Sequence, residues 1–174
     1  MGSLDVATKY YLKCVQTSSN LKTNNFISSA YSNLAEIALD TDNYAAAKMY
    51  YELSIEADKA QNNNEGLYYS YLKLSQIYQK ESPDKTNELL LKALETAKKV
   101  DDINYSVSAY IEIAEYYLKI KDYSQALKIF ILAKQSANPN SFDGLYVKVI
   151  ERINTIKNLL SESTFEQIIN EMKK

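Results

Sequence analysis

The feature that most constrains this chain is an internal repeat with a period of about 40 residues. An aromatic, an aliphatic and a small residue, followed by a tyrosine or an alanine, recur at positions i, i+3, i+4 and i+7. This spacing places the four residues on one face of an α-helix. The series comprises Tyr31, Leu34, Ala35 and Ala38; Tyr71, Leu74, Ser75 and Tyr78; and Tyr110, Ile113, Ala114 and Tyr117.

A second helical series alternates with the first and has small, large and small residues at i, i+4 and i+7. Its members are Ala7, Tyr11 and Cys14; Ala47, Tyr51 and Ser54; Thr86, Leu90 and Ala93; and Ala126, Phe130 and Ala133. Both series lose one residue between Tyr71 and Thr86, which indicates a single deletion in the loop around residues 81–83. The alternation predicts helix pairs that stack to bury a shared core.

This pattern resembles the tetratricopeptide repeat family over roughly residues 4–139. The best unit places Tyr110, Ile113, Ala114, Tyr117, Ala126, Phe130 and Ala133 at the positions typical of the family. The period is longer than the usual 34 residues or so, and it predicts longer helices. The resemblance implies an all-α fold, a right-handed α–α superhelix of antiparallel helix pairs. It also implies binding of a protein or peptide in the concave groove, without catalysis.

The repeats predict the domain organisation of the whole chain. Residues 1–3 look like the remnant of an expression tag, and Asn138, Pro139 and Asn140 interrupt the repeats. We expect Asp42, Pro83 and Asp122 at helix starts, and a capping box of Ser163 and Glu166 before the last helix. The expected segments are a half unit at 4–18, units at 24–62, 65–100 and 103–137, and C-terminal capping helices at 141–174.

The first expected helix, at residues 4–18, matches the second helix of a unit, and the first helix of that unit is missing. Ala7, Tyr11 and Cys14 should therefore lack part of their cover. Two hypotheses follow: the chain is cut from a longer protein, or the exposed helix face pairs with another copy to form a homodimer.

Composition excludes most catalytic chemistry. The chain has no histidine and one cysteine, so it cannot build a Ser-His-Asp triad, a Cys-His nucleophile or a Cys/His zinc site. Its three glycines are too far apart for a phosphate-binding loop. The net charge of −2 gives no basic footprint for nucleic acid, and no apolar run is long enough to span a membrane. We therefore expect a cytoplasmic, non-enzymatic protein without cofactor or metal.

The family resemblance implies which side chains face the concave groove. The acidic members Glu36 and Glu112 argue against a clamp for a partner's C-terminal carboxylate, so we expect a neutral or basic peptide. Two other functions stay open: a fragment of a peptide-sensing regulator, which would use Asn33, and a self-assembly scaffold. The expected groove residues are Ser29, Ser32, Asn33, Glu36, Tyr69, Lys73, Gln76, Ser108, Glu112 and Glu115.

Overall fold

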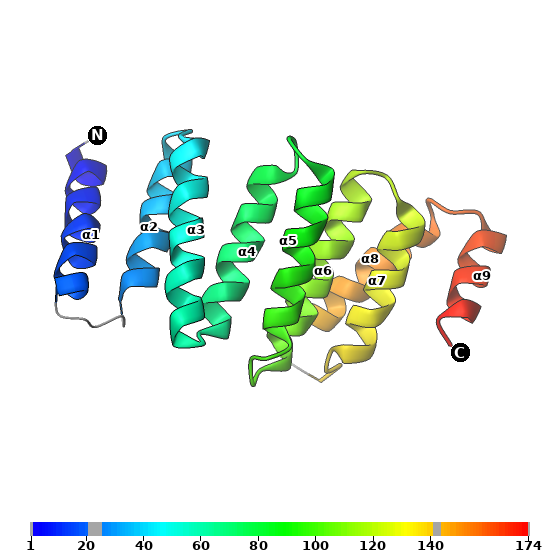
Figure 1. The fold of residues 1–174 in the computed structure, drawn as a ribbon. Coiled ribbons are helices and arrows are strands. Elements are labelled where there is room, and N and C mark those ends of the chain that lie inside the picture. The colour runs from blue at the N-terminus through cyan, green and yellow to red at the C-terminus, as the bar shows by residue number, and fades with distance from the viewer. Residues whose placement is uncertain (1, 21–25, 141–143, 174) are drawn as a thin grey trace. The chain divides into compact units, whose positions relative to one another are not determined.

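The computed structural model describes residues 2–20, 26–140 and 144–173 of the chain. It forms two compact units, Met1–Thr96 and Ala97–Lys174. Every regular element in the described residues is an α-helix, and short turns connect antiparallel helices such as α2 and α3 in the first unit and α6 and α7 in the second (Figure 1). The prediction of an all-α fold built from helix pairs is confirmed.

The first unit stacks its helices in sequence order. α1 packs against α2, α2 against α3 and α3 against α4 (Figure 1). Its core combines Ala35, Tyr51, Tyr71, Leu74 and Ala93 from the repeat positions with neighbouring aliphatic side chains. The helices are α1 (Gly2–Asn20), α2 (Ile27–Asp40), α3 (Tyr44–Gln61), α4 (Asn64–Tyr78) and α5 (Pro83–Ala97), of which α5 ends at the unit boundary.

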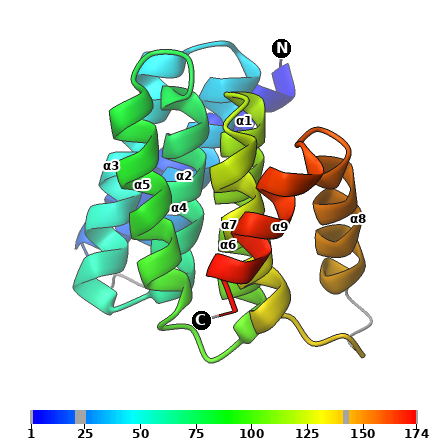
Figure 2. The ribbon, with the colours of Figure 1, turned by 90° about the vertical axis from the view of Figure 1, so that its right-hand side faces the viewer.

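The second unit pairs α6 (Ile103–Lys119) with α7 (Tyr123–Ser136). α8 (Leu145–Lys157) and α9 (Glu162–Glu171) both pack on α7 (Figure 2). Its core joins repeat positions of α6 and α7 to apolar side chains of the last two helices. These core residues include Ala114, Ala126, Phe130, Ala133, Val149, Ile156, Phe165 and Ile168.

The turns explain why the repeat period varies. Asp42 and Lys121 adopt a left-handed backbone, with φ of 56° and 64°, one residue before the N-caps of α3 and α7. The turn before α5 has no such residue, and Ser82 donates its backbone N–H directly to the Tyr78 carbonyl at 2.9 Å. The residue missing from the middle repeat is therefore the left-handed turn residue.

Two expected helix starts are wrong. The N-cap of α3 is Asn43, which accepts the Ala46 N–H at 3.1 Å, and Asp42 is the turn residue before it. The N-cap of α9 is Ser161, because its hydroxyl accepts the Thr164 N–H. This helix begins at Glu162, so Ser163 lies inside it and the expected capping box does not form. Asp122 caps α7 as expected, by accepting the Gln125 N–H at 3.0 Å.

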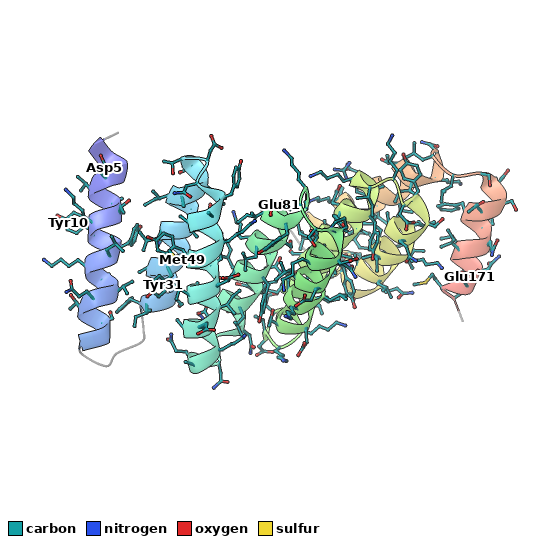
Figure 3. The ribbon with its side chains drawn as sticks, turned by 45° about the horizontal axis from the view of Figure 1, so that its top comes forward. Asp5, Tyr10, Tyr31, Met49, Glu81 and Glu171 are labelled. Atoms are coloured by element: carbon teal, nitrogen blue, oxygen red, sulfur yellow. The ribbon has the colours of Figure 1, made fainter. Side chains whose placement is uncertain are left out.

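The first helix is less covered than its counterparts, as expected. Ala7, Tyr11 and Cys14 are half-buried, whereas Ala47 and Tyr51 at the equivalent positions of α3 are 0% exposed. Tyr10 is 70% exposed and projects from α1 on the side away from α2 (Figure 3). Pairing of this face with another copy stays a prediction.

The core of the second unit makes a stability prediction. Phe130 is 0% exposed, so Phe130→Ala should lower the free energy of unfolding by about 3–5 kcal/mol through lost burial and the cavity it leaves. Urea unfolding followed by circular dichroism measures this change. Leu159→Ala is the control, because Leu159 is 51% exposed and its loss should change stability by about 0.5 kcal/mol or less. Equal effects of the two substitutions would contradict the assignment of this core.

Candidate functional site

A polar hollow of about 310 Å³ opens in the first unit. Its walls come from α2, from the end of α3 and from the start of α4. They carry hydroxyls, two side-chain amides and one carboxylate, and the described residues of the lining include no lysine or arginine. The lining residues are Ser28, Ser29, Ser32, Asn33, Asp58, Asn63, Gly66 and Tyr69.

A serine cluster joins the three helices beside this hollow. The buried Ser54 hydroxyl of α3 donates to the Ser28 carbonyl of α2 at 3.0 Å. It also lies 2.8 Å from the Ser32 hydroxyl and accepts from Ser70 of α4 at 3.2 Å. Ser54 occupies a small position of the repeat, where α2, α3 and α4 approach closely. The serine hydroxyls form hydrogen bonds with one another and with a backbone carbonyl. The contact between the three helices is therefore polar and leaves no buried side-chain donor of the cluster unpaired.

Asp58 is the unusual member of the lining, because its side chain is charged and the residue is only 1% exposed. Asn63 donates its side-chain N–H to Asp58 Oδ1 at 2.7 Å, and Ser54 lies 3.5 Å from Oδ2. No lysine or arginine among the described residues forms an ion pair with it. Burial raises the pKa of Asp58, and the hydrogen bonds from Ser28, Asn63 and Ser54 offset only part of that effect.

Gly66 makes room for the Asp58 carboxylate. A Cβ atom at Gly66 would lie 2.4 Å from Asp58 Oδ2, which is well inside van der Waals contact. The carboxylate cannot easily move away, because Asn63 holds it. Asn63 is also the N-cap of α4, where its side-chain oxygen accepts the Gly66 N–H at 3.2 Å. A glycine in the first turn of α4 thus positions a buried acid.

A second carboxylate, that of Glu36, lies beside the hollow. One of its two oxygens contacts three donors. Glu36 Oε1 accepts from the hydroxyls of Tyr51 and Tyr69, the latter at 2.7 Å, and pairs with Lys73 Nζ at 3.1 Å. Burial raises the pKa of Glu36, but these three donors outweigh burial and lower it below its ordinary value. Burial lowers the pKa of Lys73, and the bond to Glu36 outweighs that effect and raises it.

The structure brings together the groove residues expected in the first unit. Ser29, Ser32, Asn33 and Tyr69 line the hollow, and Glu36 and Lys73 join it through Tyr69. Gln76 is exposed further along α4.

The other three expected residues lie on α6 of the second unit and are half-buried. Glu115 Oε1 accepts from Arg152 Nε of α8 at 2.6 Å, so α8 already engages this side chain. The expected groove residues of α6 therefore include one that serves the packing of the second unit.

Sequence reasoning missed Ser28, Asp58, Asn63 and Gly66. A signal was available for Gly66, because an isolated glycine within a helical pattern indicates a close approach of another group. Asp58 lies four residues after the small position Ser54, outside the seven repeat positions, so the repeat pattern gave no reason to select it.

A second hollow, of about 420 Å³, lies between α7, α8 and α9. Ile131, Ile153, Ile169 and Met172 form much of its wall, and all four belong to the core of the second unit or pack on it. Lys134, Gln135, Tyr146 and Lys173 also line this hollow, which otherwise extends the apolar core of the second unit. Among the described residues there is also no cluster of metal-ligating side chains, and no helix long and apolar enough to cross a membrane.

Comparison with known proteins identifies the helix pair that forms most of the polar hollow. Residues 28–61, which span α2 and α3, match the family model of the tetratricopeptide repeat. This helix pair is a tetratricopeptide repeat. The prediction of this family from the sequence is thereby confirmed. Tetratricopeptide repeats are protein-interaction modules and are generally non-catalytic.

A solved structure extends the likeness in fold beyond the matched tetratricopeptide repeat. The chain is similar to the crystal structure of BtubC (BKLC) from P. vanneervenii, with a TM-score of 0.77 and 17% identity. The similarity covers 99% of this chain and 72% of that chain. A search of curated proteins gives no match.

The contact between Gly66 and Asp58 predicts a non-additive pair of substitutions. Gly66→Ala should lower the free energy of unfolding by about 1–3 kcal/mol, because the new methyl group overlaps the held carboxylate. In an Asp58→Ala background the overlap is gone. Gly66→Ala should then be neutral or stabilise by up to about 1 kcal/mol through helix propensity. Urea unfolding of the four proteins measures the coupling, and an equal cost in both backgrounds would contradict it.

The two carboxylates predict opposite dependences of stability on pH. The pKa of Glu36 is lowered on folding, so its contribution is present near neutral pH and is lost as the pH falls below about 4.5. Wild type should therefore be more stable than Glu36→Gln near neutral pH, and the difference should vanish in acid.

The pKa of Asp58 is raised on folding, so wild type should gain stability relative to Asp58→Asn as the pH falls. Thermal unfolding between about pH 3 and 7 compares the three proteins. Stability differences that keep the same size across this range would argue against both assignments.

Proposed function

We propose that this protein binds a peptide segment of a partner protein at the inner surface of the first unit, and that it performs no catalysis. The polar hollow carries this proposal. Four of the residues that the family resemblance assigns to the groove line it, and they come from α2 and α4, the first helices of two successive units.

The chemistry of the hollow suits a peptide. Ser29, Ser32 and Asn33 offer hydroxyl and amide groups that both donate and accept, and a peptide backbone presents N–H and C=O groups that match them. Asn33 is exposed, and its side chain forms no hydrogen bond with the other described residues of the first unit, so its amide is available to a ligand. The described lining contains no histidine, lysine or cysteine to activate a hydroxyl or to act as the nucleophile, which supports a binding function over an enzymatic one.

The charges of the site favour a neutral or basic peptide. Glu36 is not a free negative charge, because Lys73 pairs with it. Lys73 is equally unavailable to a carboxylate, and the described residues that line the hollow include no cation. Asp58 adds a negative charge to the wall, so a partner's C-terminal carboxylate would meet repulsion without compensation.

A peptide-sensing regulator remains the alternative function. Such a protein would hold a peptide backbone with groove asparagines, and the hollow adds Asn63 to Asn33. Asn63 is already bonded to Gly66 and Asp58, so Asn33 is the asparagine available to a ligand. This observation supports peptide binding in general and does not favour the regulator.

Peptide selection followed by substitution tests the proposed function. Peptides selected from a random library on the purified chain should bind less tightly to Asn33→Ala by about fivefold, the loss of one hydrogen bond of about 1 kcal/mol. Fluorescence anisotropy with the selected peptide measures the affinity. Asn154→Ala is the matched control, because Asn154 is an exposed helical asparagine of the second unit. A peptide whose affinity is unchanged by Asn33→Ala would count against this surface.

A further inference from the structure

We propose that the polar hollow is a site for a primary alkylammonium group, supplied by a lysine side chain of the bound peptide. This inference rests on the proposed function and names the group that the hollow recognises. The structure brings together a buried carboxylate and several neutral oxygen acceptors, in a lining whose described residues include no cation.

The first argument is the missing counter-charge. Asp58 is 1% exposed, and its hydrogen-bond partners are the neutral groups of Ser28, Asn63 and Ser54. Buried carboxylates are normally paired with a cation, because burial without one is costly. Lys73 is the lysine beside the hollow, and Glu36 already holds it at 3.1 Å. A cation that enters the hollow would therefore supply the charge that Asp58 lacks.

The second argument distinguishes an ammonium from a guanidinium. Asn63 already donates to Asp58 Oδ1 at 2.7 Å, and Ser28 is a further hydrogen-bond donor to the carboxylate, whereas the contact of Ser54 with Oδ2 is weaker, at 3.5 Å. A guanidinium binds a carboxylate best when both oxygens are available, whereas an ammonium is a compact point charge with three donors. One available carboxylate oxygen fits the ammonium.

The third argument is that acceptors surround the hollow. The hydroxyls of Ser29 and Ser32 and the side-chain carbonyl of Asn33 can take the remaining ammonium donors. At the side of Tyr69, all three donors to Glu36 contact Oε1. Glu36 therefore keeps Lys73 beside it and away from the hollow. The volume of about 310 Å³ accommodates the end of one side chain.

Nuclear magnetic resonance of the isotope-labelled full chain tests this inference with defined probes. N-acetyl-lysine methylamide should shift the backbone amides of Ser29, Asn33 and Gly66 in a saturable manner. N-acetyl-norleucine methylamide, its uncharged counterpart, should not. Asp58→Asn should weaken binding of the lysine probe at least tenfold, whereas Glu56→Gln, at an exposed acid of α3, should leave it unchanged. Equal binding of the two probes, or binding insensitive to Asp58→Asn, would overturn the proposal.

If Asp58→Asn does not fold, substitutions at an exposed residue of the lining still test whether the hollow binds an ammonium group. Ser29 is exposed on α2, so Ser29→Lys and Ser29→Glu should both fold. Ser29→Lys should abolish binding of the lysine probe through a competing ammonium, and Ser29→Glu should strengthen it. Identical affinities of the two variants would reject an ammonium site.

Two further results separate this inference from the proposed function. If selected peptides lack lysine but depend on Asn33, peptide binding stands and the ammonium site is rejected. If the lysine probe binds and no peptide can be selected, the ammonium site stands and the peptide function is rejected. Cadaverine, a free diamine, distinguishes the source of the ammonium: tighter binding of cadaverine than of the lysine probe would overturn the assignment to a peptide side chain.

Discussion

The close approach of neighbouring helices is the constraint on which the rest of this structure depends. Small side chains such as Ala35, Ala47 and Ala126 are 0% exposed and leave room for the large aromatic residues beside them. Tyr51 and Phe130 fill equivalent positions in the two units, and both are also 0% exposed. Each unit therefore owes its stability to interlocking small and large residues, because a single helix pair cannot bury its own apolar face.

The polar hollow is a local departure from this packing. At Ser54 the small position carries a hydroxyl, and serines of α2 and α4 meet it. Nearby, Gly66 has no side chain, and the Asp58 carboxylate occupies the space that a Cβ atom would need. The same geometry that brings helices together in the core brings polar groups together at this joint. A site of this kind needs no special loop, only the replacement of a few repeat residues by hydroxyls and one acid.

Much of the fold could be predicted from the sequence, because the spacing of the repeated residues determines which face of each helix is buried. Residues such as Leu34, Ala114 and Ala133 are buried as their spacing predicts. The site was predicted only in part. Ser29, Ser32, Asn33 and Tyr69 occupy family groove positions and were found, whereas Asp58 and Gly66 act through one specific contact that no periodic pattern contains. The engagement of Glu115 by Arg152 depends on how α8 packs, and the repeat pattern does not extend to α8.

The three turns between paired helices show how such a chain tolerates changes in length. Asp42 and Lys121 each occupy a left-handed position that the turn before α5 omits, and Ser82 closes that shorter turn with a direct bond to Tyr78. The omission leaves the flanking helix faces in register, since Tyr71, Leu74 and Ala93 all remain buried. Insertion or loss of one residue at this point is thus structurally silent. A repeat of this protein can therefore be one residue shorter than its neighbours while the helix faces on either side of the turn keep their alignment.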